Sequence, residues 1–213
     1  MYKNKYLKYK AKYLKLKEEL EGGGLVDYMS GNITIPNGTK EIKDNEYYRK
    51  NKISVTIPNS VTKIGKRAFM NNKLTNVIIP DSVIEIGENA FNTNELTNVT
   101  LGKNVKIIGS SAFSNNKLTN IIIPNSVTLI YDFAFSNNQL TNVTIGNSVT
   151  AIGEQAFSYN PLTSIVIPKS VTNIVSSAFS FTKLRKVTIP RKFQSEVRNI
   201  FINYRNIQFT YLD

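Results

Sequence analysis

The chain has 213 residues and contains neither cysteine nor histidine, which excludes disulfide bridges, thiol nucleophiles, imidazole acid–base catalysis and the common zinc sites. Its formal net charge is +12. Residues 1–24 carry seven Lys and three Glu and residues 165–213 carry eight basic and two acidic side chains, whereas residues 77–164 carry three basic and six acidic ones, so positive charge does not run along the centre.

Residues 1–24 are predicted to form a basic, heptad-like helical arm that ends in a glycine linker. Apolar side chains recur at three- and four-residue spacing, and Lys fills the other faces. The seam consists of Tyr6, Tyr9, Tyr13, Leu16 and Leu20. Its positive charges precede its negative ones and oppose the helix dipole, so the arm alone should fray. Three roles stay open: docking or oligomerisation through residues 2–20, contact with nucleic acid or anionic lipid, or a solvated tail.

The sequence gives no sign of a membrane or secretory segment. No apolar run reaches the roughly 20 residues that cross a bilayer, and lysines between residues 3 and 17 interrupt any signal-peptide core. We therefore expect neither a transmembrane helix nor a signal peptide.

A degenerate repeat at residues 25–53 is predicted to cap the N-terminal end of a repeat array. Ile33–Pro36 lies one repeat length before Val55–Pro58, and Ile42 and Tyr47 precede an isoleucine and a phenylalanine of the next copy by the same interval. Terminal repeats of such arrays are commonly degenerate because they cover the open end of the core.

Residues 54–190 consist of 22-residue repeats of the form L-T-N-V-x-I-P-x-S-V-x-x-I-G-x-x-A-F-x-x-N-x. Six copies superimpose without an insertion, and their phenylalanines are Phe69, Phe91, Phe113, Phe135, Phe157 and Phe179. Each copy contains a short strand, with Val77 and Ile79 facing inward and Asn76 and Ile78 facing outward in one example. Parallel stacking at about 4.8 Å per coil would bury one continuous core.

Two successive repeats form a larger 44-residue unit. Pro80, Pro124 and Pro168 alternate with Gly102 and Gly146 at the end of the predicted strand, and strands of the type I-I-I or I-V-I alternate with V-T-L or V-T-I.

Residues 191–213 are predicted to form a C-terminal cap made of a helix and a last strand. Helical spacing connects Phe193, Val197, Ile200, Phe201 and Tyr204. Phe209–Tyr211 falls on the strand register of the repeats. The predicted fold class is therefore an α/β-type leucine-rich-repeat solenoid, with a parallel β-sheet on one face, a short N-terminal helix and a C-terminal capping helix.

The repeat resembles the BspA-like, or Treponema-type, leucine-rich repeats, whose hallmark is V-x-I-P-x-S-V-x-x-I-G-x-x-A-F, over about residues 32–190. That resemblance implies a curved solenoid that binds proteins or surfaces and has no shared catalytic residues. The segment Lys5–Lys17 resembles a leader found on proteins of mimivirus-like giant viruses, which implies an origin more than a task.

The outward strand positions form the candidate interaction surface. Its residues are Asn76, Ile78, Asn98, Thr100, Asn120, Ile122, Asn142, Thr144 and Val166. A weakly polar sheet of this kind could bind a protein or a glycan. The alternative is that β-branched and amide ladders only stabilise the stacked strands.

A second column of amides follows the A-F pair, where related repeats often carry cysteine. It contains Asn72, Asn94, Asn116, Asn138 and Asn160. Buried amides at a turn satisfy backbone groups that the coil leaves unpaired, so we assign this column a structural role.

A candidate basic patch lies at the C-terminal end of the array. Its residues are Lys183, Arg185, Lys186, Arg191 and Lys192. The patch could receive nucleic acid, another polyanion or an acidic protein. The alternative is a solvated end that prevents solenoids from stacking end to end.

These observations predict a non-enzymatic protein that needs no cofactor or metal. Carboxylate pairs such as Glu85 with Glu88 have no histidine, ligand spacing or glycine-rich loop beside them. We expect a host or virion protein as the partner, in the host cytoplasm or the virion. Two alternatives are a virion component that assembles through the arm, and polyanion binding by the basic ends.

Overall fold

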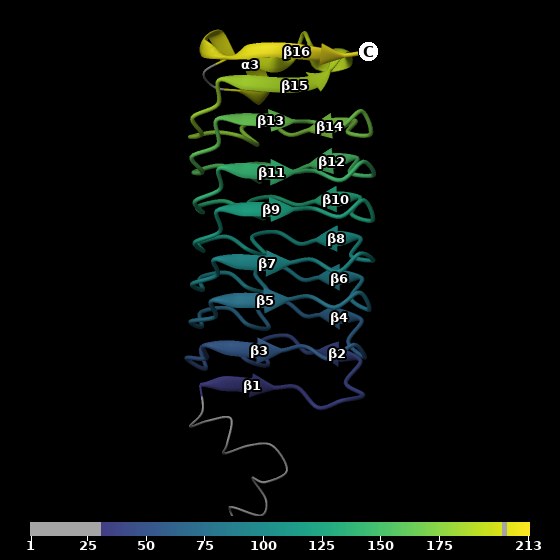
Figure 1. The fold of residues 1–213 in the computed structure, drawn as a ribbon, viewed down its shortest axis with the longest axis vertical. Helices are drawn as coiled ribbons and strands as arrows, with labels where there is room; N and C mark the ends of the chain where they lie inside the picture. The colour runs from purple at the N-terminus through teal and green to yellow at the C-terminus, as the bar shows by residue number, and fades with distance from the viewer. Residues whose placement is uncertain (1–30, 202–203) are drawn as a thin grey trace, which may run out of the picture.

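The computed structural model describes residues 31–201 and 204–213, which form one column of stacked coils (Figure 1). One strand of each coil lies on what we call the front face. These strands are β1 (Asn32–Thr34), β3 (Ser54–Thr56), β5 (Asn76–Ile78), β7 (Asn98–Thr100), β9 (Asn120–Ile122), β11 (Asn142–Thr144), β13 (Ser164–Val166), β15 (Lys186–Pro190) and β16 (Gln208–Leu212). All the pairings between them are parallel, and each residue pairs with its equivalent one repeat away.

A second parallel sheet, which the sequence analysis did not predict, lies behind the front face. Its seven two-residue strands are β2 (Glu41–Ile42), β4 (Lys63–Ile64), β6 (Glu85–Ile86), β8 (Ile107–Ile108), β10 (Leu129–Ile130), β12 (Ala151–Ile152) and β14 (Asn173–Ile174). The isoleucine of each strand is buried, and the preceding residue points outward and carries surface ion pairs in the first coils. For example, the Lys63 ammonium lies 3.8 Å from a Glu41 oxygen and 3.9 Å from a Glu85 oxygen.

The core between the two sheets is filled by side chains that recur once in every repeat. On β5, Val77 and the following Ile79 are buried while Asn76 and Ile78 are exposed, as the strand alternation predicted. The phenylalanines stack with ring centroids 5.0–5.6 Å apart and nearly parallel planes. Tyr47 extends this spine at one end and Phe201 at the other. Offset aromatic stacking adds to the apolar burial, so the spine fixes the register of the coils.

The buried asparagine column joins consecutive coils by hydrogen bonds, which confirms its predicted structural role. The Asn116 amide nitrogen donates to the carbonyl oxygens of Phe91 at 3.0 Å and Phe113 at 3.1 Å. Its amide oxygen accepts from the Leu96 N–H at 3.0 Å. Asn72, Asn94, Asn138 and Asn160 make the equivalent bonds.

The predicted C-terminal capping helix is wrong in its extent. Residues 191–206 contain only a 3₁₀ turn η1 (Arg191–Phe193), a four-residue α3 (Val197–Ile200) and a second 3₁₀ turn η2 (Tyr204–Asn206) among their described positions. Phe201 is extended and stacks on Phe179, its equivalent in the preceding repeat. The repeat register therefore outweighs the helical spacing here. The predicted last strand is confirmed as β16, which pairs with β15.

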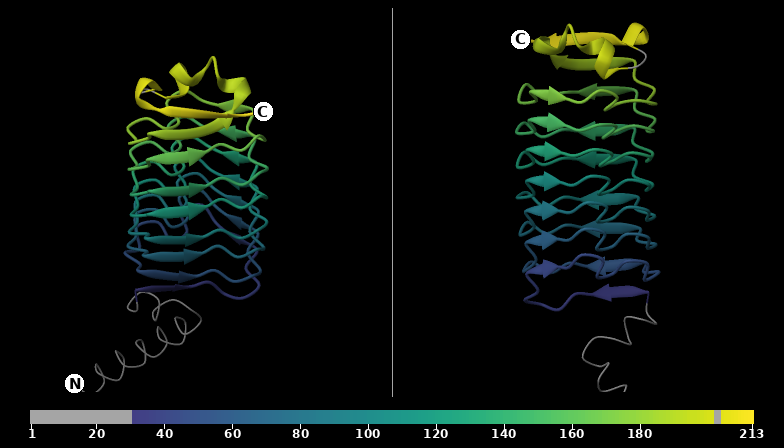
Figure 2. Two further views of the ribbon diagram at one scale, coloured as in Figure 1. Left: turned by 45° about the horizontal axis from the view of Figure 1, so that its top comes forward. Right: turned by 180° about the vertical axis from the view of Figure 1, so that it is seen from behind.

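Two further expectations concern the shape and the N-terminus. The family resemblance implied a curved solenoid, whereas Figures 1 and 2 show an almost straight column. The predicted N-terminal helix at residues 1–24 and the seam at residues 2–20 lie outside the described residues.

Candidate interaction face

All nine residues of the predicted interaction surface lie on the front face, on five neighbouring strands from β5 to β13, and all are exposed. The apolar members stand out among them. Ile78, Ile122 and Val166 keep 69%, 68% and 58% of their surface exposed, on β5, β9 and β13. They therefore recur on every second coil, and the strands between them carry Thr100 and Thr144 at the same position.

The front face is not one continuous sheet. Its strands form the groups β1–β3, β5–β7, β9–β11 and β13–β15–β16, and in the described part of the chain no backbone ladder joins one group to the next. Figure 1 shows this grouping as alternating narrow and wide gaps between neighbouring strands. The 44-residue unit of the sequence therefore has a structural counterpart in the pairing of the coils.

A backbone hydrogen bond just after the first strand of a central group joins it to the second strand. The Ile79 N–H donates to the carbonyl oxygen of Thr100 at 2.8 Å, and the Ile123 N–H donates to the carbonyl oxygen of Thr144 at 2.9 Å. Gly102 and Gly146 stand at these contacts, and their lack of a side chain lets the second coil of each pair approach the first. The outer pairs carry proline at this position, Pro58 in β1–β3 and Pro190 in β13–β15, so glycine is confined to the two central pairs.

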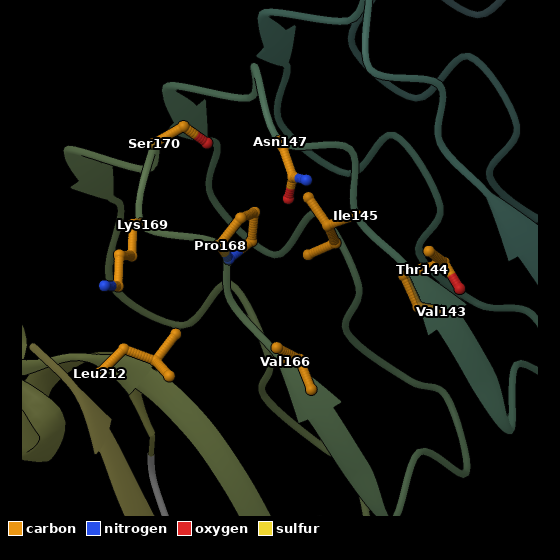
Figure 3. Close-up of a pocket in the computed structure, with 9 residues that line it drawn as sticks. All are labelled: Val143, Thr144, Ile145, Asn147, Val166, Pro168, Lys169, Ser170 and Leu212. Atoms are coloured by element: carbon orange, nitrogen blue, oxygen red, sulfur yellow. The ribbon is translucent and has the colours of Figure 1, made fainter.

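Shallow grooves open where two groups meet. Val55, Val99 and Val143, on the second strand of a group, are only partly buried, whereas Val77, Ile121 and Ile165 on the first strand are buried. The groove between β11 and β13 has a volume of about 540 Å³ and that between β3 and β5 about 390 Å³. Figure 3 shows the first, with Val143 and Thr144 on one side and Val166 and Pro168 on the other. Each of these grooves thus lies beside one of the exposed apolar side chains.

The structure divides the predicted basic patch into two groups. Lys183, Arg185 and Lys186 lie at the start of β15, whereas Arg191 and Lys192 follow its end. A five-residue strand separates its ends by roughly 13 Å. Arg191 also forms an ion pair with Asp213, which raises the pKa of the guanidinium and lowers that of the carboxyl group. The two groups therefore do not present one surface.

Five carboxylates of the repeat region pair with neighbouring lysines: Glu41, Asp81, Glu85, Glu88 and Glu95. A hydrogen bond from Lys103 lowers the pKa of Asp81, and one from Lys117 lowers the pKa of Glu95. Glu88 pairs with Lys66 at 2.7 Å. Within residues 31–201 and 204–213, no group of three or more acidic side chains is placed to hold a metal ion. The same residues include no helix with the length and apolar content needed to cross a membrane.

Exposed aromatic side chains at the turns were missed by the sequence analysis. Tyr131 stands where most copies have glycine, and Tyr159 and Phe181 stand where central copies have asparagine. Tyr159 and Phe181 stack at 4.4 Å with positive φ angles, a conformation that bulky residues rarely adopt. Their departure from the repeat consensus was the signal that could have identified them.

Three solved structures of bacterial proteins are similar to this chain. A leucine-rich cell surface protein from Faecalibacterium prausnitzii A2-165 is 24% identical, with a TM-score of 0.48, over 84% of this chain and 59% of its own. A leucine-rich repeat protein from Bacteroides ovatus ATCC 8483 is 20% identical, with a TM-score of 0.29, over 85% and 77%. The pneumococcal vaccine antigen PcpA is 18% identical, with a TM-score of 0.37, over 74% and 62%. The chain thus spans less than two thirds of the first and third structures.

The comparison with curated proteins finds no match. None of these comparisons supports the giant-virus resemblance of residues 5–17, which lie outside the described residues. The family model for the BspA type leucine-rich repeat region, by contrast, matches residues 29–132 and 84–208, which together cover most of the chain, in six copies. The chain therefore belongs to the BspA-type leucine-rich-repeat family.

Proposed function

We propose that this chain is a non-enzymatic binding module and that its front face mediates protein–protein interaction. The observation that carries the proposal is the row of Ile78, Ile122 and Val166, which stays exposed on the front face although the same strands bury their other apolar side chains. Exposed apolar side chains that line up beside grooves are typical of interaction sites.

Two other features support a protein partner over a polyanion. The predicted surface from β5 to β13 carries no charged side chain, so it offers nothing to a phosphate backbone. The basic side chains at the C-terminal end fall into two groups, and Arg191 already has a carboxylate partner. The origin in a giant virus, and hence a host or virion partner, stays a hypothesis that rests on residues 5–17 alone.

Affinity capture with the full chain tests the proposal. The front-face variant combines Ile78→Lys, Ile122→Lys and Val166→Lys, and the control variant combines Ile84→Lys, Tyr131→Lys and Phe181→Lys, which are exposed apolar residues outside this row. We expect proteins that wild type and control retain to be lost by the front-face variant. Equal retention by both variants would contradict the proposal.

A further inference from the structure

The spacing of the exposed apolar row limits the kind of partner that fits it. Consecutive coils are separated by at least the usual strand distance of about 4.8 Å, and rings of the spine lie no more than 5.6 Å apart. Two coils therefore rise by roughly 9.6–11 Å. An α-helix repeats its side-chain position every seven residues, at about 10.5 Å. An extended strand repeats at roughly 7 Å and a polyproline helix at about 9.3 Å, so the heptad helix fits best.

The N-terminal arm of this chain has that heptad spacing. Tyr6, Tyr13 and Leu20 are seven residues apart, and as a helix they would span about 21 Å. Ile78 and Val166 are four coils apart, which is roughly 19–22 Å. Both the period and the total length of the apolar row therefore match the arm.

Charge indicates the direction in which the arm would lie. Its lysines occupy the first part and Glu18, Glu19 and Glu21 the last part. On the solenoid, the strands from β5 to β13 present uncharged outward residues, and the next coil presents Lys183, Arg185 and Lys186, all exposed. The acidic end of the arm would therefore lie at the C-terminal coil, with Leu20 beside Val166 and Tyr6 beside Ile78.

That direction favours an arm from another molecule. The arm precedes β1, which is the strand at the opposite end of the column from β15 (Figure 1). An arm that folded back on its own chain with a short connection would bring its lysines, and not its glutamates, to the basic coil. A second copy has no such restriction.

We infer that the front face binds the N-terminal arm of a second copy of this chain as a helix, with Tyr6, Tyr13 and Leu20 packed beside Ile78, Ile122 and Val166. Binding would also cover the grooves and supply the tertiary contacts that an arm with unfavourable charge order lacks by itself. The inference rests on the proposed function and names the partner of the front face.

Sedimentation equilibrium of the full chain tests this inference. We expect a concentration-dependent dimer, and we expect Ile122→Lys on the face and Tyr13→Lys in the arm each to weaken dimerisation at least tenfold. Tyr131→Lys, at an exposed tyrosine of the turn, is the matched control and should leave the dimer unchanged. Thermal unfolding by circular dichroism checks that each variant remains folded.

A charge exchange tests the direction of the arm. Lys186→Glu should weaken the dimer, and adding Glu21→Lys to the same chain should restore it. A monomer at all concentrations, or equal dimerisation by the Ile122→Lys and Tyr131→Lys variants, would overturn the inference. Either result would leave the proposed function standing if the capture experiment still shows a partner that the front-face variant loses.

Discussion

Gly102 lies so close to Pro80 that a Cβ atom on the glycine would stand 2.2 Å from the proline carbonyl oxygen. Gly146 and Pro124 repeat this relationship two coils later, at 2.3 Å. The contact is between backbones, so no side-chain movement can relieve it. It explains why glycine occupies the second coil of each central pair.

Gly102→Ala should therefore destabilise the fold by about 1–3 kcal/mol, because the new methyl group forces the paired coils apart. The measurement is the free energy of unfolding from urea denaturation. Thr100→Ala, an exposed change on the same coil, is the control and should alter that free energy by less than about 0.5 kcal/mol. Similar values for the two variants would show that the close contact does not limit the packing.

Amide hydrogen exchange should reveal the grouping of the strands directly. The N–H groups of Ile79 and Ile123 donate across a pair, whereas Leu101 and Ile145, at the same repeat position in the second coil, have no backbone acceptor among the described residues. We expect exchange at Ile79 and Ile123 to be at least about tenfold slower. Equal rates at all four positions would mean that the front face is one continuous sheet.

Asn116→Ala should lower the free energy of unfolding by about 1–3 kcal/mol, because it leaves buried backbone groups without hydrogen-bond partners. The groups affected are the N–H of Leu96 and the carbonyl oxygens of Phe91 and Phe113. Asn120→Ala removes an exposed amide and serves as the control. The free energies of unfolding of both variants are measured by urea denaturation. Equal values would show that the asparagine column does not stabilise the fold.

Lys52→Leu should stabilise the chain by about 1 kcal/mol or more. Lys52 lies one repeat before Leu74, so it occupies the leucine position of its coil. It is only 5% exposed, and its ammonium group has no hydrogen-bond partner among the described residues. Leucine would continue the apolar column without an unpaired buried cation. Lys50→Leu, at an exposed site nearby, should leave thermal unfolding unchanged, and a decrease for Lys52→Leu would contradict this interpretation.

The repeat period predicts much of this fold because each coil must bury the same positions. Val77, Phe113 and Asn116 were placed correctly from spacing alone, and so were Ile42 and Tyr47 in the degenerate first coil. The C-terminal helix was wrong because helical spacing was preferred where Phe201 continues the repeat register of Phe179.

Other features depend on backbone geometry that spacing does not reveal. The proline and glycine alternation of the central repeats was visible, but it did not predict the separation of the front face into groups, because the outer pairs β1–β3 and β13–β15 form with Pro58 and Pro190 at the same position. The two-residue strands of the second parallel sheet are too short to give a periodic signal. The exposed apolar side chains of the candidate site were placed correctly on outward positions, yet their arrangement beside grooves required coordinates.

The central claim is that one aromatic spine holds all coils in register and so forms the front face. Unfolding of Phe113→Ala, compared with Tyr131→Ala, tests it most directly, because Phe113 is fully buried between Phe91 and Phe135. We predict a loss of about 3–5 kcal/mol for Phe113→Ala and almost none for the exposed tyrosine. A Phe113→Ala variant as stable as wild type would contradict the spine and, with it, the binding face that the spine supports.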